Sequence, residues 1–139
     1  MKDSSGDWNN TKAALDAFGR SGFDVFVGSE KFLLANLRGG GVGTITATAN
    51  VNPAAIDRLY RSWRSPEAEQ LQESINVIRS AFENQPAVPA LKAAVAHHSG
   101  DAGWRTVRPP LVELTDPQTA TLLSTLQQAG FTMPGLQPA

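Results

Sequence analysis

The sequence has 139 residues, of which 41% are hydrophobic and 18% charged, and its formal net charge is -1. This composition is typical of one soluble globular unit with a modest core. The 12 basic and 13 acidic residues are spread along the chain, so no charged patch predicts nucleic acid or a membrane as a partner. Because there is no cysteine, no signal-like segment and no bilayer-length apolar run, we exclude thiolate chemistry and expect a cytoplasmic location.

The first third of the chain predicts a helix, a strand and a second helix. Polar residues at 9–10 lead into a helical pattern over Thr11–Phe18, which Gly19 ends. The apolar run Asp24–Gly28 is rich in β-formers and predicts a strand that is buried on both faces. Ser29 can then cap a helix that continues to Gly39.

The segment Val42–Ala49 is rich in β-branched residues and follows three glycines, so it predicts a second strand. Pro53 stands where a first helical turn tolerates proline and opens a helix to about Trp63. A longer helix restarts at Ser65–Glu67 and carries an apolar stripe at helical spacing, made of Leu71, Ile75, Ile78 and Phe82.

The last third predicts helices over about 90–97 and 116–130, joined by an irregular link around 108–110. Strands that alternate with helices predict right-handed, parallel βαβ units. Only two full strands are visible, and so small a sheet would expose unpaired edges. We therefore expect association with a second copy (a homo-oligomer) or with strands of a missing N-terminal half.

Several of these stretches together resemble one family. In chain order they are Lys2–Asp7, Val25–Glu30, Gly39–Asn50 with Pro53, Pro89–Lys92 and Val107–Leu111. Their order and spacing resemble the dihydrodipicolinate synthase and N-acetylneuraminate lyase family of class I, Schiff-base aldolases. The resemblance implies an α/β fold: residues 1–84 would be the C-terminal portion of a (β/α)8 TIM barrel, from the end of strand six to helix eight, and residues 85–139 a helical C-terminal extension.

The resemblance also implies a catalytic lysine. Lys2 falls on the lysine of this family that forms an imine with pyruvate or a related 2-oxo acid, and no cofactor is expected. A protonated imine withdraws electrons, so the neighbouring carbon can react or leave as an enamine. The amine must first be neutral, a state that burial in the barrel mouth favours.

Further substrate-binding positions follow from the same resemblance. Gly28 matches a glycine that leaves room for ligand at the end of strand seven. Ser29 and Glu30 match positions that touch substrate hydroxyls in sugar-acid-cleaving members. Gly43 and Ile45 match positions of strand eight that flank pyruvate, with the isoleucine as an apolar wall.

Two motifs of the family have no counterpart in this sequence. The GxxGE-type motif with paired hydroxyls, which binds the substrate carboxylate, belongs to the N-terminal half of the family. The proton-relaying tyrosine comes from strand five, whereas Tyr60 lies in a helix expected after the last strand. Two hypotheses stay open: the chain is the second half of a pyruvate-dependent aldolase or lyase, or it is a non-catalytic fragment or assembly module.

Simpler interpretations stand beside the functional ones. Lys2 can be a mobile terminal lysine, Asp3 and Asp7 can cap or turn the following loop, and Glu30 can complement a helix dipole. Gly39–Gly41 precedes a strand, which favours a tight turn over a nucleotide loop. Adjacent His97 and His98 lack the ligand spacing of a metal site, and none is expected.

Overall fold

The computed structural model of the chain describes residues 1–136, and for Arg20 it describes the backbone alone. The chain forms two compact units. The first consists of residues 1–49 and 53–76, and the second of residues 50–52 and those from 77 onward. Each unit is described by itself.

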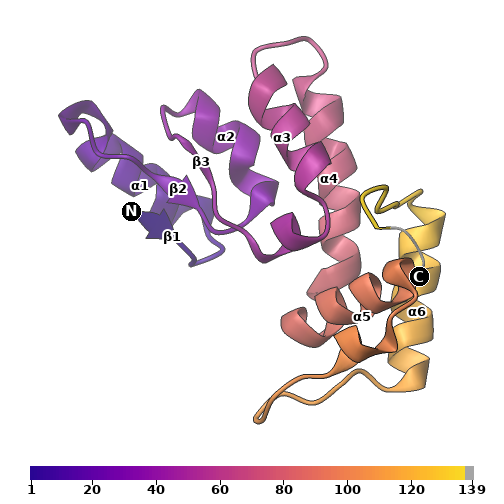
Figure 1. Ribbon diagram of the computed structural model, residues 1–139. Helices are drawn as coiled ribbons and strands as arrows, with labels where there is room; N and C mark the ends of the chain where they lie inside the picture. Colours follow the sequence, from indigo (N-terminus) through magenta and orange to yellow (C-terminus); the bar gives the residue numbers. More distant parts are fainter. Residues whose placement is uncertain (137–139) are drawn as a thin grey trace. The chain divides into compact units, whose positions relative to one another are not determined.

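The first unit contains a parallel three-stranded sheet in the order β1-β2-β3. Its strands are β1 (Lys2–Asp3), β2 (Phe26–Val27) and β3 (Gly43–Thr44). Figure 1 shows the strands next to one another with helices beside them. The helices of this unit are α1 (Trp8–Phe18), α2 (Leu33–Arg38), α3 (Pro53–Ser62) and the first part of α4 (Ala68–Glu83).

Short polar side chains cap two of the helical segments in the first unit. Asp7 caps α1 by accepting a hydrogen bond from the backbone N–H of Asn9, so the helix begins earlier than predicted. The suggestion that Asp7 has a capping role is confirmed, although the sequence predicted the start of this helix at residues 9–10. Ser29 caps the 3-10 helix η2 (Glu30–Phe32), and this turn leads into α2, where the sequence predicted one continuous helix.

The strands are shorter than the sequence predicted. Phe26–Val27 lies inside the predicted strand 24–28, but the prediction of a strand over 42–49 was wrong beyond its first residues. Ala47–Asn50 instead forms the 3-10 helix η3. The buried hydroxyls of Thr46 and Thr48 both bond to Glu30, which draws this segment away from a straight extended path.

Apolar side chains from α2, α3 and α4 form the core of the first unit. The buried members are Leu33, Leu34, Leu37, Ile56, Leu59, Ala68 and Ile75. Leu33 and Leu59 have no exposed surface. The spacing of the apolar residues on α3 and α4 follows the helical period, so burial of these faces is the main stabilising term for the helices around the sheet.

One buried amide fixes the turn between α2 and β3. Asn36 has no exposed surface and donates hydrogen bonds to the carbonyl oxygens of Val25, at 3.1 Å, and Gly43, at 3.0 Å. Its side chain lies in the space that a Cβ at position 41 would occupy. Gly41 is therefore required because the Asn36 amide fills the place of a side chain.

The second unit is helical. It contains the end of α4, then α5 (Ala87–Ser99), the 3-10 helix η4 (Ala102–Arg105) and α6 (Asp116–Gln128). Thr115 and Gln118 form a capping box at the start of α6. The buried core of the second unit includes Phe82, Ala90, Leu122, Leu126 and Phe131. Of the predicted helical extension 85–139, residues 137–139 lie outside the described residues.

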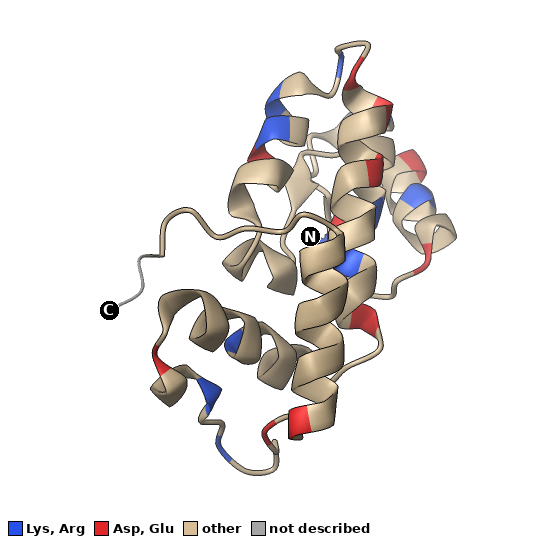
Figure 2. Ribbon diagram, turned by 90° about the vertical axis from the view of Figure 1, so that its right-hand side faces the viewer, with Lys and Arg blue, Asp and Glu red and all other residues tan. Residues whose placement is uncertain are grey.

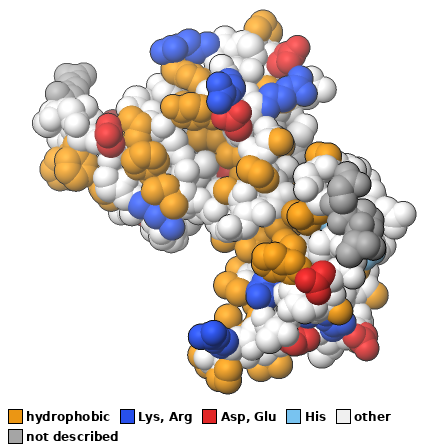
Figure 3. All heavy atoms as spheres, in the orientation of Figure 1, with side chains coloured by type: hydrophobic (Ala, Val, Ile, Leu, Met, Phe, Trp, Pro, Cys, Tyr) orange, Lys and Arg blue, Asp and Glu red, His pale blue; other side chains and the backbone are white. Residues whose placement is uncertain are grey.

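The surface carries charges of both signs. Figure 2 shows basic and acidic residues interspersed along the helices. Hydrophobic side chains are also visible on the face drawn in Figure 3, and the exposed ones of the first unit include Phe18, Phe23, Ile45 and Tyr60. Within residues 1–136, none of the helices combines the length and the apolar character needed to cross a membrane.

Candidate active site

The three strands place Lys2 in register with residues far along the chain. Lys2 pairs with Phe26, and Phe26 pairs with Gly43. The backbone N–H of Phe26 donates to the carbonyl oxygen of Met1 at 2.9 Å, and that of Gly28 donates to the carbonyl oxygen of Asp3 at 2.6 Å. Lys2 is thus held between two ladder bonds at one edge of the sheet.

Alternation along the strands puts four of the predicted site residues on one face. Lys2, Phe26 and Gly43 form one row of that face, and Gly28 and Ile45 continue it two residues further on. The ladder bond from the Ile45 N–H to the Val27 carbonyl oxygen, at 2.9 Å, extends the register to this second row. The sheet therefore brings Lys2, Gly28, Gly43 and Ile45 together on one side.

This face is open in the described part of the chain. Lys2 is exposed, and Ile45 keeps 50% of its surface accessible. The opposite face is covered, since Val27 is 1% and Asp3 7% exposed. Residues 1–136 leave Lys2 exposed, so the burial that was expected for its amine would need a further surface over this face.

Gly28 permits a close approach of β1 and β2 directly after Lys2. A Cβ at this position would lie 2.7 Å from the carbonyl oxygen of Asp3 and 3.0 Å from the Cα of Ser4. Both are backbone atoms, which cannot rotate out of the way. The glycine is therefore needed for the pairing that holds Lys2, whatever room it also leaves for a ligand.

On the covered face, the carboxylate of Asp3 binds the segment that follows it. One oxygen accepts from the Ser5 N–H at 2.9 Å and from the Asn10 amide at 3.0 Å. The other accepts from the hydroxyls of Ser5, at 3.0 Å, and Thr11, at 2.5 Å. The suggestion that Asp3 turns the following loop is confirmed. The sequence alone gave no signal for its contact with Thr11.

These hydrogen bonds set the ionisation of Asp3. Burial raises the pKa of its carboxyl, but the hydrogen bonds from Thr11, Ser5 and Asn10 together outweigh that effect, so its pKa lies below the usual value. Hydrogen bonds to the charged form of an acid favour ionisation. Asp3 is therefore a charged, fully engaged carboxylate at neutral pH.

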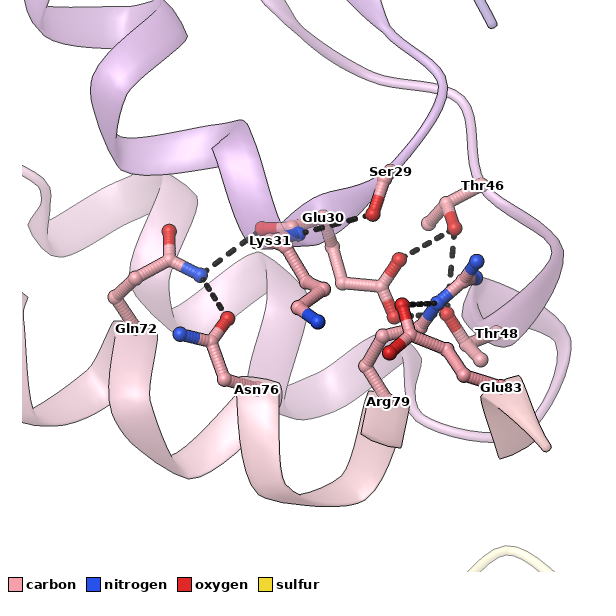
Figure 4. A network of polar contacts seen from close by, with 9 residues as sticks. All are labelled: Ser29, Glu30, Lys31, Thr46, Thr48, Gln72, Asn76, Arg79 and Glu83. Atoms are coloured by element: carbon pink, nitrogen blue, oxygen red, sulfur yellow. Dashed lines mark hydrogen bonds and ion pairs between the residues drawn. The ribbon is translucent and has the colours of Figure 1, made fainter. Parts of the chain in front are cut away.

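Glu30 lies in a buried polar network, which Figure 4 shows. Its side chain is 2% exposed, and its carboxylate accepts hydrogen bonds from the hydroxyls of Thr46 and Thr48. The Gln72 amide donates to the Glu30 carbonyl oxygen at 3.0 Å and accepts from the Leu34 N–H at 2.9 Å. Glu30 thus links the loops that follow β2 and β3 at the carboxyl ends of both strands.

Ser29 has a local role beside its predicted one. Its hydroxyl oxygen accepts from the Lys31 N–H at 3.4 Å and so caps η2. The two suggested contacts of Ser29 and Glu30 with substrate hydroxyls stay predictions. Glu30 also lies in the first turn of η2, as the helix-dipole interpretation requires.

A groove of about 320 Å³ lies beside the third strand. Its lining is mostly apolar and includes Phe26, Val42, Gly43, Ile56 and Tyr60. Tyr60 belongs to α3, after the last strand of the sheet, as the sequence predicted. The groove thus includes Phe26 and Gly43, which lie in the same row of the sheet as Lys2.

The histidine pair lies elsewhere. His97 and His98 lie in the last turn of α5 in the second unit, with ring centroids 5.2 Å apart. Burial, together with the charge of His97, lowers the pKa of His98. No group of three or more His, Cys, Asp or Glu side chains in the described part of the chain is arranged to hold a metal ion.

Comparison with known proteins supplies the context for this sheet. The sequence model described as the Dihydrodipicolinate synthetase family matches residues 1–129. An uncharacterized DapA-like lyase of Chloroflexus aurantiacus is 29% identical over 123 residues, which are 88% of this chain and 40% of that protein. The 4-hydroxy-tetrahydrodipicolinate synthase of Methanopyrus kandleri is 30% identical over 135 residues, 94% of this chain and 44% of that protein.

Solved structures of the same family also superpose on this chain. The dihydrodipicolinate synthase from Agrobacterium tumefaciens superposes with a TM-score of 0.77 at 26% identity, over 92% of this chain and 42% of that one. A second match is YagE, a prophage protein of the dihydrodipicolinic acid synthase family from E. coli K12, which was solved in complex with pyruvate. It superposes with a TM-score of 0.81 at 26% identity, over 94% of this chain and 45% of that one.

These structural neighbours are TIM-barrel proteins, and the chain spans between 40% and 45% of the length of the proteins just named. The match of the family model over 129 of the 139 residues settles membership. The chain belongs to the dihydrodipicolinate synthetase family.

Proposed function

We propose that this chain is the C-terminal portion of a pyruvate-dependent class I aldolase or lyase, and that Lys2 is its Schiff-base lysine. Residues 1–84 would run from the end of barrel strand six to helix eight, and residues 85–139 would form the helical extension. The observation that carries the proposal is the register of the sheet, which gives Lys2, Gly28, Gly43 and Ile45 a common face.

The chemistry follows from an amine on that face. The Nζ lone pair of Lys2 attacks the C2 carbonyl carbon of the 2-oxo acid, and the carbonyl oxygen leaves as water once it has been protonated. The resulting iminium takes up the electron pair released when C3 loses a proton or breaks a carbon–carbon bond, which gives an enamine. Family membership and the pyruvate complex of YagE support a 2-oxo acid as the substrate.

The neighbours of Lys2 on the open face suit a small planar acid. Gly28 and Gly43 carry no side chain, and the backbone of β1 at Gly28 and the Phe26 ring at Gly43 lie close to the strands in their place. Ile45 offers an apolar wall, and its exposed surface leaves it free to contact a ligand. Ser29 would contact a hydroxyl of a longer substrate, whereas Glu30 is 2% exposed and its carboxylate accepts from Thr46 and Thr48, so it would reach a substrate only after leaving these partners. The groups that bind the substrate carboxylate and relay protons would come from the N-terminal half of the enzyme.

Borohydride trapping tests the proposal. The full-length protein is incubated with pyruvate, reduced with borohydride and digested, and the adduct is located by mass spectrometry. We expect the adduct on Lys2, and its loss in Lys2→Arg, which keeps the positive charge. Lys12→Arg, a change at an exposed lysine of α1, is the matched control and should keep it. An unmodified Lys2 in the wild-type protein overturns the proposal.

A second candidate is a non-catalytic assembly module, favoured by the open face and by strand edges that lack partners within residues 1–136. Unpaired edges promote strand addition, so the chain would associate with a second copy or with the remaining half of the barrel. This candidate predicts no retro-aldol turnover by the isolated 139 residues, together with concentration-dependent association in sedimentation. A compact monomer at all concentrations, or clear turnover, would contradict it.

A further inference from the structure

We infer that Asp3 is a positioning residue for Lys2: its carboxylate fastens strand β1 to helix α1 and so fixes the backbone from which the lysine extends. This role rests on the proposed function of Lys2. It concerns a residue on the face of the sheet opposite the reacting amine, where no contact with substrate is expected.

The strand that carries Lys2 has little support of its own. β1 consists of two residues and pairs with β2 alone in the described part of the chain. Toward β2, the carbonyl oxygens of Met1 and Asp3 accept hydrogen bonds from the backbone N–H groups of Phe26 and Gly28. A two-residue strand at an edge opens easily, so a second attachment is needed to hold Lys2 in one place.

The Asp3 side chain provides that attachment. Alternation turns it to the covered face, where it is 7% exposed and accepts hydrogen bonds from Ser5, Asn10 and Thr11. Thr11 is itself 1% exposed. Every hydrogen-bond distance from the carboxylate is 3.0 Å or shorter. These are charge-assisted bonds, which are stronger and more directional than neutral ones.

The helix at the other end of this attachment is held independently of Asp3. The Trp8 ring lies 6.2 Å from the Phe32 ring, and Leu15 is buried at 6% exposure. Removing the Asp3 carboxylate should therefore free β1 while α1 stays in place. The consequence is local movement of the Lys2 backbone.

Such movement matters for catalysis because a nucleophile must be held near its productive geometry. Lys2 and Asp3 are adjacent, so a shift of the Asp3 Cα carries the Lys2 Cα with it. The Asp3 carboxylate acts through the backbone of Lys2 and does not take part in the reaction. Its loss should slow imine formation more than it weakens binding of the 2-oxo acid.

The test compares matched variants of the full-length protein at a temperature where circular dichroism shows all of them folded. The rate of borohydride-trapped adduct on Lys2 is measured against pyruvate concentration. In Asp3→Asn we expect at least about a tenfold fall in the maximal rate, since a displacement of about 1 Å can cost about 100-fold. The pyruvate concentration at half-maximal rate should stay within about twofold.

Two changes at Thr11 separate the hydrogen bond from the packing. Thr11→Val keeps the shape but removes the donor to Asp3, and should lower the rate in the same direction as Asp3→Asn. Thr11→Ser keeps a hydroxyl donor for Asp3 and should keep most of the wild-type rate. Asp16→Asn removes an exposed carboxylate of α1 that pairs with Lys12, and should leave the rate unchanged.

Amide hydrogen exchange gives a readout that does not need pyruvate. The N–H groups of Phe26 and Gly28 donate to β1, so their exchange should accelerate in Asp3→Asn by about tenfold or more, while that of Ile75 in the core should not. A wild-type protein without an adduct on Lys2 overturns the proposed function. A wild-type adduct with unchanged trapping rates in Asp3→Asn and Thr11→Val, or unchanged exchange, overturns the positioning role alone.

Discussion

Replacing Gly28 with alanine should separate β1 from β2. The added Cβ would lie 2.7 Å from the Asp3 carbonyl oxygen, whereas ordinary contacts begin at 3.4 Å. Strand β1 must therefore retreat by about 0.7 Å, which lengthens the 2.6 Å ladder bond from the Gly28 N–H toward the limit of a hydrogen bond. Overpacking of this kind costs about 1–3 kcal/mol, and we expect about 2 kcal/mol because an edge strand can move.

The cost converts to a melting temperature. With an unfolding entropy of about 2.1 cal/mol/K per residue, a loss of about 2 kcal/mol lowers the Tm of a chain of this length by roughly 7 °C. Differential scanning calorimetry of the wild type and Gly28→Ala measures it. Trapping of pyruvate on Lys2 should fall in parallel, because the same displacement moves the lysine.

Gly19→Ala is the matched control. Gly19 has helical angles, φ -58° and ψ -38°, and an added Cβ would meet nothing within 4 Å. Its replacement should leave the Tm unchanged or raise it slightly, because alanine loses less backbone entropy than glycine on folding. If Gly28→Ala melts with the wild type, the close approach of the strands does not constrain this position and the reasoning is wrong.

Three further predictions concern buried polar groups. Asn36→Leu should lower the free energy of unfolding by about 2–4 kcal/mol in urea, because two buried carbonyl oxygens lose their donor; a loss below about 1 kcal/mol would contradict this. The folded-state pKa of Asp3 lies below its ordinary value of 3.8, so its stabilisation is complete above that value and disappears as the pH falls through the folded-state pKa. Urea unfolding from roughly pH 6 to pH 2 should show this loss in the wild type and a smaller one in Asp3→Asn; equal losses would contradict the assignment. Thr48→Val should cost about 1–3 kcal/mol in urea unfolding by removing a donor to buried Glu30, whereas Thr125→Val, at an exposed site of α6, should change stability by less than about 0.5 kcal/mol; equal effects would refute the distinction.

The elements with strong local signals could be predicted from the sequence. The apolar run at 24–28 contains β2, and the apolar stripe with Ile75 and Phe82 lies on α4. The cap at Ser29 was also correct. In each case neighbouring residues determine the structure, through hydrophobic period or through a side chain that bonds its own backbone.

Features that depend on distant partners could not be predicted in this way. β1 consists of Lys2 and Asp3, which have no strand-like pattern, and only the family resemblance pointed to a strand end there. The β-branched Thr46 and Thr48 suggested a longer strand, yet their hydroxyls donate hydrogen bonds to the Glu30 carboxylate. A glutamate is seldom buried, so nothing local indicated that Glu30 would be 2% exposed.

The candidate site shows the same division. The resemblance nominated Lys2, Gly28, Gly43 and Ile45 one by one, and only the parallel register explains why they share a face. Asp3 could be seen as a turn residue but not as a partner of Thr11, since their contact requires α1 to fold back on β1. Hydrogen bonds of that kind become visible only in three dimensions.

The interlocking of Asn36 with position 41 has a consequence for how sequences of this kind can diverge. A larger residue at position 41 would clash with the Asn36 amide. In a sequence that lacks this amide, glycine at position 41 is no longer required. A side chain at position 41 can therefore be accommodated only after the Asn36 amide has been replaced. Among distant homologues, positions 36 and 41 should therefore covary, and a sequence that keeps Asn36 with a larger residue at 41 should be rare.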